Sequence, residues 1–259
     1  MYINTKFSSV NYPLRTCKIE YIILHYTEIL LEDALAKLTD PESEVSAHYL
    51  IKEDGEVLQL VDDYKIAWHA GKSSWKNFTH LNSYSLGIEI DNPGTSEFSA
   101  IQMQSCIELC SYLVNKHNIN SSNVIGHSDV APDRKIDPGI FFDWQMLAKH
   151  GLGYWHGLEY RQNLANTILY KFGQQGKEIA NFQHDLRELG YKLNISGKID
   201  SQTSNVIRAF QAHFCPELIW DKGGLGFYQN LSAIYHWDSF SEQALQKLLS
   251  SKSVINNNS

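Results

Sequence analysis

The hydrophobic pattern near the start of the chain changes from strand-like to helix-like. Residues 18–26 form an almost continuous run of β-branched, aromatic and aliphatic side chains, which is typical of a strand buried on both faces. Apolar residues then recur at helical spacing from Leu30 to Leu38. Pro41 ends this pattern, because the residue before a proline is pushed out of the helical conformation. The segment predicts a central strand followed by a helix.

The pattern further along predicts a hairpin and a second strand–helix–strand sequence. Two short apolar runs are joined through Asp54-Gly55, a dipeptide that favours a tight hairpin turn. The expected elements are hairpin strands at 47–52 and 56–61, a strand at 85–90, a helix from about 97 to 117 and a strand at 123–126. Strands that alternate with helices, with one hairpin between them, predict an α/β fold with a mixed central sheet flanked by helices.

The texture changes after residue 143, where glycine and aromatic residues become frequent and GQQG at 173–176 suggests a hinge. Apolar residues at helical spacing beyond it predict three short helices. Their expected boundaries are Gly190 at the end of the first, Asp200 or Ser201 at the start of the second, and a capping box of Ser239 and Glu242 at the start of the third. We therefore expect two domains, at 1–172 and 177–259, the second a small all-α three-helix domain.

The composition excludes several classes of protein. A hydrophobic fraction of 43% and a charged fraction of 20% indicate a folded globular chain and not a disordered one. With 22 basic and 29 acidic side chains the net charge is −7, which argues against a protein that neutralises nucleic-acid phosphates. The four cysteines form no CxxC pair, so neither a thiolate zinc site nor a disulfide framework is expected.

The sequence gives no indication of membrane insertion. No apolar run approaches the roughly 20 residues needed to span a bilayer, so we expect no transmembrane segment. The first residues lack the basic-then-apolar order of a signal peptide.

Polar side chains stand at the ends of several predicted strands. His25 closes the first strand, Glu89 lies near the end of another, and His127 directly follows a third, with Asp137 ten residues beyond it. Side chains at the ends of neighbouring strands converge at one edge of an open α/β sheet. Two imidazoles and one carboxylate suit zinc, and three protein ligands leave the fourth position for water. Each residue alone is weak support, because a single histidine among 11 is more often structural than a ligand.

Four motifs in the first domain carry a family resemblance. They are VSAHYLIKEDGEVLQLV (45–61), AWHAG (67–71), SLGIEI (85–90) and GHSDVAPDRKIDPG (126–139). Their order and spacing resemble those of the zinc-dependent N-acetylmuramoyl-L-alanine amidases, which are related to the peptidoglycan recognition proteins and to phage amidase lysozymes. The resemblance covers roughly residues 18–145.

This resemblance implies roles for five residues. The metal ligands of the family fall on His25, His127 and Asp137, its catalytic carboxylate on Glu89, and its basic residue near the metal on Lys135. None of the five departs from the family pattern. Glu89 is then expected to act as general base and later as general acid, and Lys135 to stabilise the oxyanion. The implied activity is zinc-dependent hydrolysis of the amide bond between N-acetylmuramic acid and L-alanine in peptidoglycan or anhydro-muropeptides.

Four further residues are candidate substrate contacts. Trp68 and His69 suit a sugar ring and a substrate amide, respectively, because an aromatic face stacks on a sugar and an imidazole hydrogen-bonds. Lys72 is expected either to meet the carboxylates of the stem peptide or to lie on an exposed loop. His48 is included in this group and could be a ligand by its residue type, but with three ligands already assigned we expect it to support the ligands from behind or to be structural.

The second domain also carries a resemblance. Residues 182–191 and 197–211 resemble the three-helix peptidoglycan-binding module that accompanies many cell-wall hydrolases. About 25 residues after Phe214 exceed the usual length of that module. The resemblance implies peptidoglycan or muropeptides as the binding partner, and we expect a monomer without nucleic acid. The module favours the bacterial cell envelope, in the periplasm, whereas the lack of a visible signal peptide favours the cytoplasm.

Two other functions are compatible with these motifs. A recognition or sensor protein would bind muropeptides without cutting them, but the complete ligand set together with Glu89 favours an enzyme. A structural zinc protein is disfavoured, because a closed site needs a fourth protein ligand.

Overall fold

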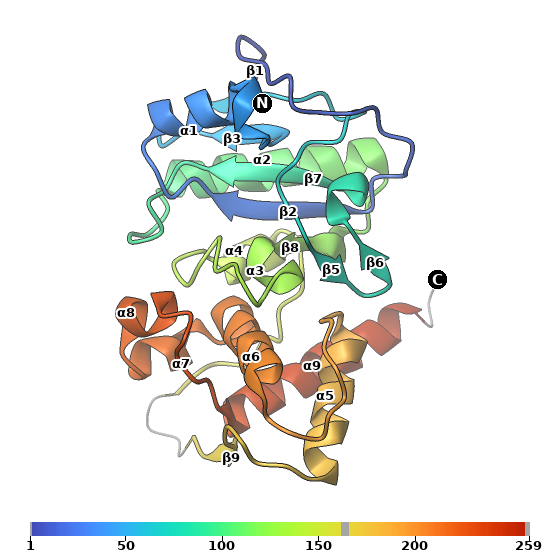
Figure 1. The fold of residues 1–259 in the computed structure, drawn as a ribbon, viewed down its shortest axis with the longest axis vertical. Helices are drawn as coiled ribbons and strands as arrows, with labels where there is room; N and C mark the ends of the chain where they lie inside the picture. The colour runs from blue at the N-terminus through green and yellow to red at the C-terminus, as the bar shows by residue number, and fades with distance from the viewer. Residues whose placement is uncertain (1, 162–165, 257–259) are drawn as a thin grey trace. The chain divides into compact units, whose positions relative to one another are not determined.

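The chain divides into two units, each with its own core (Figure 1). The computed structural model describes residues 2–161 and 166–256, with side chains up to residue 251. The first unit comprises Met1–Ser73, Phe78–His127 and Asp137–Gly153, and the second comprises Ser74–Asn77, Ser128–Ile136 and Tyr154–Ser259.

A six-stranded sheet forms the centre of the first unit, in the order β1-β4-β3-β7-β2-β8. Its strands are β1 (Ile3–Asn4), β2 (Tyr21–Tyr26), β3 (Tyr49–Ile51), β4 (Val57–Gln59), β7 (Ser85–Ile90) and β8 (Val124–Gly126). The hairpin strands β3 and β4 are antiparallel, and every other neighbouring pair is parallel. The prediction of a mixed sheet is therefore confirmed.

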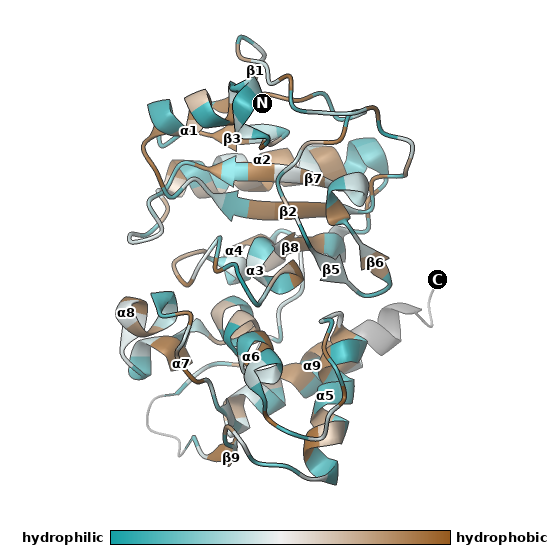
Figure 2. Cartoon of the chain, in the orientation of Figure 1, coloured by the Kyte–Doolittle hydropathy of each residue, from teal (hydrophilic) through white to brown (hydrophobic). Residues whose placement is uncertain are grey.

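Strand β2 is the buried centre that the continuous apolar run predicts. Ile22, Ile23 and Leu24 have no exposed surface, and the strand is coloured as hydrophobic along most of its length in Figure 2. The strand lies between β7 and β8 in the parallel part of the sheet, and such strands are buried on both faces because helices cover the sheet.

Helices cover both faces of this sheet. Helix α1 (Leu31–Thr39) packs through Ala34 and Leu38 against Leu50 of β3. The neighbouring residue Tyr49, which points to the opposite face, contacts the end of α2 (Ala100–His117) through Asp63. The remaining elements before residue 150 are α3 (His127–Val130), α4 (Trp144–Lys149), β5 (Ser74–Trp75), β6 (Phe78–Thr79), η1 (Pro41–Ser43), η2 (Leu81–Tyr84) and η3 (Ser121–Asn123).

The second unit contains the three predicted helices, α5 (Lys177–Leu189), α6 (Ser201–Phe214) and α9 (Ser239–Asn256). Gly190 ends the first of them, and the Asp200 side chain accepts from the backbone N–H of Thr203 to cap the second, both as predicted. The unexpectedly long segment after Phe214 forms two short helices that the sequence did not predict, α7 (Pro216–Asp221) and α8 (Gly224–Gln229). A small antiparallel pair, β9 (Ile168–Tyr170) and β10 (Trp237–Asp238), completes the unit.

The expected capping box at the start of α9 is wrong. Asp238 occupies the capping role one residue earlier, because its Oδ1 accepts from the backbone N–H of Ser241. The Glu242 carboxylate accepts instead from the indole N–H of Trp237, whose ring is fully buried. The local pattern assigns Glu242 to the helix cap, but its side chain bonds the buried Trp237 instead.

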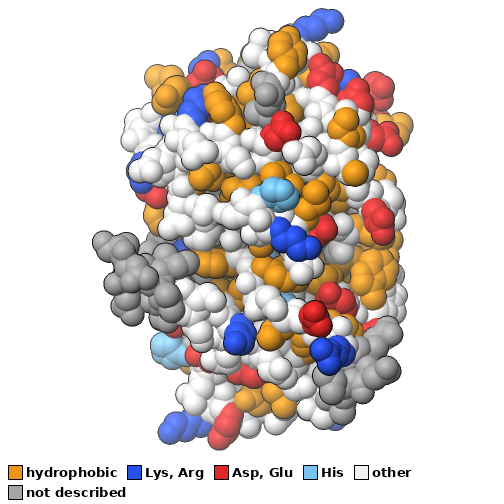
Figure 3. Space-filling model, turned by 180° about the vertical axis from the view of Figure 1, so that it is seen from behind, with side chains coloured by type: hydrophobic (Ala, Val, Ile, Leu, Met, Phe, Trp, Pro, Cys, Tyr) orange, Lys and Arg blue, Asp and Glu red, His pale blue; other side chains and the backbone are white. Residues whose placement is uncertain are grey.

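The surface of the described residues is mixed in character. Figure 3 shows acidic, basic and apolar side chains interspersed over one face. Of the helices in the described part of the chain, none combines the length and the apolar character needed to cross a membrane.

A buried carboxylate joins the hairpin region to the end of α2. Asp63 is 1% exposed and accepts hydrogen bonds from the Tyr49 hydroxyl at 2.6 Å and from Lys116 and His117 at 2.7 Å each. Burial by itself would raise the pKa of Asp63, but the hydrogen bonds from Lys116, Tyr49 and His117 outweigh it and hold the pKa below its usual value.

This carboxylate makes the stability of the fold dependent on pH. Because its pKa is lower in the folded than in the unfolded chain, its contribution is present above the unfolded pKa of 3.8 and is lost as the pH falls through the folded value. Asp63→Asn is expected to lower the free energy of unfolding by about 1–3 kcal/mol at pH 7, and this deficit should shrink below pH 3.8. Urea unfolding followed by circular dichroism measures it. The exposed neighbour Asp62 gives the control Asp62→Asn, and an equal loss in both variants would contradict the assignment.

Candidate metal centre and active site

The candidate site lies at the carboxyl ends of three adjacent parallel strands. In the register of β2 with β7, His25 is directly opposite Glu89. In the register of β2 with β8, Leu24 is opposite Gly126, so His127 follows at the next position. The sequence prediction that these strand-end side chains converge is supported by this geometry.

Three ligand atoms meet at this edge of the sheet. The Nδ1 atoms of His25 and His127 are 2.9 Å apart, and Asp137 Oδ2 lies 3.0 Å from the first and 2.9 Å from the second. All three residues are buried. Among the described residues they form a group of three potential metal ligands, with no fourth histidine, cysteine or carboxylate in it.

The protonation of His25 is fixed by a chain of hydrogen bonds behind it. The Ser85 hydroxyl donates to the Leu81 carbonyl at 2.6 Å, so its oxygen accepts from His69 Nε2–H at 3.2 Å. His69 Nδ1 is then an acceptor and receives His25 Nε2–H at 3.0 Å. In neutral His25 the proton is therefore on Nε2, and Nδ1 presents a lone pair to the centre.

The second imidazole is oriented in the same way. His127 Nε2–H donates to the Ala70 carbonyl at 3.3 Å, which leaves its Nδ1 as an acceptor. Ala70 and His69 are neighbours in the AWHAG motif, and the Asn82 side-chain oxygen accepts from both of their backbone N–H groups, at 2.7 and 3.2 Å. One short segment thus supplies the outer partners of both imidazoles, which is the usual arrangement behind metal-bound histidines.

The donor set fits a zinc ion. Three acceptor atoms within about 3 Å of one another repel unless a cation lies between them, and ligand atoms in a tetrahedral zinc site lie about 3.4 Å apart. Asp137 supplies the one carboxylate of the set, and a carboxylate binds zinc through an oxygen in its ionised form. Two imidazoles and one carboxylate leave one tetrahedral position open, as in catalytic zinc sites.

Gly87 makes room for the imidazole behind His25. A Cβ added at this position would lie 2.3 Å from the His69 ring, on the same face of β7 as Glu89. The backbone N–H of Gly87 donates to Nδ1 of His48 at 3.0 Å. A glycine inside a strand marks a close approach of this kind, so Gly87 is the sequence signal that could have revealed the ring packed against β7.

The sheet itself places Glu89 beside the candidate metal ligand His25. Its position directly opposite His25 in a parallel pair puts both side chains on the same face. One of its carboxylate oxygens, Oε2, is buried. A partly enclosed carboxylate beside an open ligand position suits a group that exchanges protons with a reacting water.

Lys135 lies two residues before Asp137 and is half-buried. Its backbone N–H donates to the Ala131 carbonyl at 3.0 Å. The segment that contains it, Ser128–Ile136, belongs to the second unit although it joins two ligands of the first.

The candidate substrate contacts have different surroundings. Trp68 is 36% exposed and Lys72 is exposed, so both are accessible to a ligand. His69 is engaged with His25 and Ser85 as described. His48 has no exposed surface, and its Nε2 lies 3.1 Å from the Lys65 carbonyl, which favours the structural role over a substrate contact. Burial first, and then the charge of Arg15, lowers the pKa of His48 to about 3.

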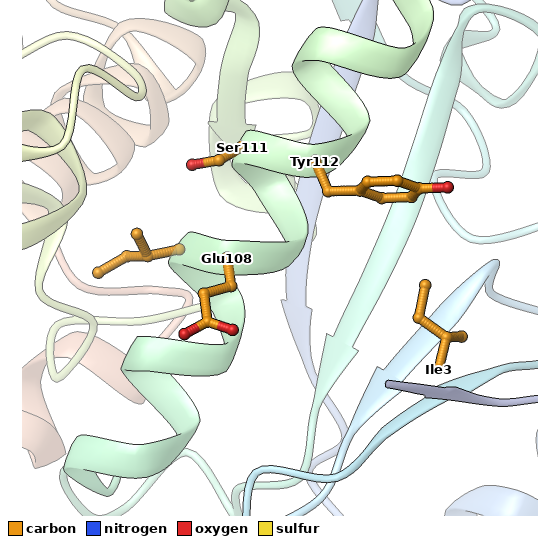
Figure 4. A pocket seen from close by; sticks show the side chains of 5 residues that line it. Ile3, Glu108, Ser111 and Tyr112 are labelled. Carbon is orange, nitrogen blue, oxygen red and sulfur yellow. The ribbon is translucent and has the colours of Figure 1, made fainter. Parts of the chain in front are cut away.

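A separate surface hollow, of about 560 Å³, lies at the other edge of the sheet. It is lined by Ile3 of β1 and by four residues of α2: Ile107, Glu108, Ser111 and Tyr112. Figure 4 shows these side chains around it. None of the candidate metal or catalytic residues lines this hollow, so it does not belong to the site.

A sheet edge with a buried His/His/Asp set and a neighbouring glutamate is the arrangement found in metal-dependent hydrolases. A family model described as N-acetylmuramoyl-L-alanine amidase matches residues 15–140, and one described as a peptidoglycan binding domain matches residues 175–217. Both resemblances inferred from the sequence are thereby confirmed.

Known proteins are similar over most of the chain. The N-acetylmuramoyl-L-alanine amidase AmiD of Escherichia coli K12 is 34% identical over 217 residues, which are 78% of this chain and 76% of that protein. A structure of the E. coli AmiD amidase with the substrate anhydro-N-acetylmuramic acid-L-Ala-D-γ-Glu-L-Lys is 30% identical, with a TM-score of 0.70 and 92% of each chain covered. The 1,6-anhydro-N-acetylmuramyl-L-alanine amidase AmpD of Citrobacter freundii is 41% identical over 100 residues, 39% of this chain and 54% of that protein. This chain belongs to the N-acetylmuramoyl-L-alanine amidase family.

The contact between Gly87 and His69 gives a test of the outer hydrogen bonds. Gly87→Ala should displace the His69 ring, leave His25 without its Nε2–H acceptor and weaken zinc binding about 10- to 100-fold. Competition with a chromogenic chelator measures the affinity. Gly226→Ala is the control, because a Cβ there meets no heavy atom within 4 Å. Wild-type affinity in Gly87→Ala would rule out this support of His25.

Proposed function

We propose that this protein hydrolyses the amide bond between N-acetylmuramic acid and L-alanine in muropeptides, with zinc held by His25, His127 and Asp137. The observation that carries the proposal is the convergence of three buried acceptor atoms beside Glu89 in a member of the amidase family. Anhydro-muropeptides are the proposed substrate class, because the similar AmiD structure contains such a molecule.

The metal and the protein divide the chemistry between them. When bound, zinc supplies a Lewis acid that lowers the pKa of a water towards about 7 and polarises the scissile carbonyl. The protein orients both imidazoles, with Nδ1 towards the centre, through His69 and the Ala70 carbonyl. This fixed orientation means that the site does not have to reorganise when the substrate binds.

Glu89 is proposed to move the proton. Its carboxylate takes a proton from the attacking water and delivers it to the leaving amine of L-alanine, so the group returns to its starting state after each cycle. Lys135 is proposed to place its ammonium near the oxygen that becomes negative as the carbonyl is attacked. Trp68 and Lys72, which are both accessible, are proposed to contact the sugar and the stem peptide.

Muropeptide recognition without cleavage is the less well supported function. A protein that only binds the ligand needs neither an open metal position nor a carboxylate beside it, and this chain has the residues for both. The peptidoglycan-binding domain match at 175–217 supports a further proposal, that the protein works in the bacterial cell envelope, where intact peptidoglycan is present.

Removal of the metal should abolish the activity reversibly. Prolonged treatment with a strong chelator is expected to stop release of the L-alanine-led peptide from an anhydro-muropeptide, because the ion supplies the Lewis acid. Added zinc should restore the release, because the three acceptor atoms bind the ion reversibly. Chromatography with mass spectrometry measures the product. Unchanged activity after exhaustive chelation would refute the metal assignment.

Loss of the proposed proton carrier should separate catalysis from metal binding. Glu89→Gln keeps the shape of the side chain but removes its basicity, so the turnover number is expected to fall about 10²- to 10⁴-fold while zinc content stays at the wild-type level. Glu108→Gln, an exposed change on α2, serves as the control and should remain fully active. A fully active Glu89→Gln enzyme would refute the proposed mechanism.

A further inference from the structure

The segment between two of the proposed metal ligands, His127 and Asp137, belongs to the second unit, which we call the helical unit. Residues Ser128–Ile136 begin directly after His127 and end directly before Asp137, yet they cluster with Tyr154–Ser259 in the second unit. Because the segment is covalently joined to His127 and to Asp137, its path limits where both of these residues can lie. Lys135 is part of it.

A buried carboxylate anchors the start of the segment. Asp129 is 1% exposed and lies two residues after His127. Its Oδ2 accepts from Nδ1–H of His213, in the last turn of α6, at 2.7 Å. Its Oδ1 accepts from the Tyr191 hydroxyl, just after α5, at 2.7 Å. Both partners are themselves buried, at 3% and 1% exposure.

Two backbone carbonyls anchor the rest of the segment. The guanidinium of Arg208, in α6, donates to the Pro132 carbonyl at 2.6 Å. The hydroxyl of Tyr228, in α8, donates to the Ile136 carbonyl, immediately before Asp137. Arg208 and Tyr228 are 1% and 2% exposed.

A second stretch of the amidase-like region is held by the same helical unit. The Trp75 ring packs against Gly190, where an added Cβ would lie 2.4 Å from it, and meets the Tyr191 ring edge-on at a centroid distance of 4.9 Å. The backbone N–H of Lys76 donates to the Gly190 carbonyl at 2.7 Å. Tyr191 thus contacts Trp75 with its ring and Asp129 with its hydroxyl.

The hydrogen bonds to Asp129, Pro132 and Ile136 come from buried donors, so water does not compete for them. A buried carboxylate that loses a donor retains its desolvation cost, so removal of either donor to Asp129 is unfavourable. The helical unit supplies the donors, and the segment supplies the acceptors. The path of the segment is therefore determined by residues far along the chain.

We propose that Tyr191, His213 and Tyr228 are positioning residues for the amidase reaction, which hold the segment that joins His127 to Asp137 and carries Lys135. The part of this proposal that concerns kcat and KM rests on the proposed function. The helical unit then has a role in the reaction that is separate from binding to the cell wall.

The proposal is tested in the full-length protein with Tyr191→Phe/Tyr228→Phe, which removes two hydroxyl donors and keeps both rings. Tyr235→Phe is the matched control, because Tyr235 is equally buried and its hydroxyl faces the Phe227 carbonyl instead. Three quantities are compared: zinc affinity by chelator competition, hydrogen exchange of residues 128–136 in the zinc-free protein, and kcat and KM on a soluble anhydro-muropeptide.

The double variant is expected to exchange faster at the Arg134 and Lys135 amides, both bonded to the Ala131 carbonyl. Its zinc affinity should fall about tenfold or more, and its kcat should fall about tenfold or more with little change in KM, because misplacement of catalytic groups reduces turnover. The control should match the wild type in all three measurements.

Wild-type zinc affinity and exchange in the double variant would overturn the proposal. So would an equal, uniform rise in exchange across the whole second unit, which indicates a merely structural role. Should the double variant lose its helical circular dichroism, the single variants Tyr191→Phe and Tyr228→Phe decide by the same criteria. A wild-type protein that does not cleave the muropeptide would refute the proposed function, while zinc affinity and exchange would still decide the positioning role.

Discussion

The parallel register of β2 with β7 and β8 is the constraint on which the rest of the site depends. It sets His25 opposite Glu89 and puts His127 one position beyond the pair formed by Leu24 and Gly126. A slip of one residue would turn His25 to the other face of the sheet, because side chains alternate along a strand. The fully buried Ile22, Ile23 and Leu24 oppose such a slip, since it would exchange the environments of both faces.

Behind the strand-end histidines lies a second layer of residues that hydrogen-bond to the imidazole rings. Ser85, His69 and the Ala70 carbonyl determine which nitrogen of each metal-facing imidazole carries its hydrogen. Their positions depend in turn on Asn82, which holds the AWHAG backbone, and on Gly87, which leaves space for an aromatic ring above the strand. The AWHAG motif therefore supports the two candidate metal-binding histidines from behind.

The sequence predicts the sheet, the main helices and the strand-end ligands because each has a local or periodic signal. The apolar run before His25, the Asp54-Gly55 turn and the helical spacing before Gly190 are signals of this kind. It does not predict that His69 lies behind His25, since that contact joins residues 44 positions apart. For the same reason the bonds of Asp129 were missed, because tertiary packing selects those partners. The Asp238 cap is a local contact; it was missed because Ser239 and Glu242 fit the local capping pattern as well, and Glu242 bonds the buried Trp237 instead. The helices α7 and α8 lie in a segment rich in glycine and aromatic residues, whose weak helical propensity is overridden by burial of Leu218, Ile219 and Tyr228.

The buried Asp129 carboxylate also limits how such proteins can be recombined. A cut in the linker near residue 172 respects the division that the sequence suggests, yet it would separate Asp129 from His213 and Tyr191. A transplanted first unit would lose the two donors that satisfy the Asp129 carboxylate, and an exchanged second unit would need a histidine and a tyrosine at matching places. In this chain, the segment that must be transferred together to keep these bonds extends beyond the amidase match at residues 15–140 and includes Tyr191 and His213.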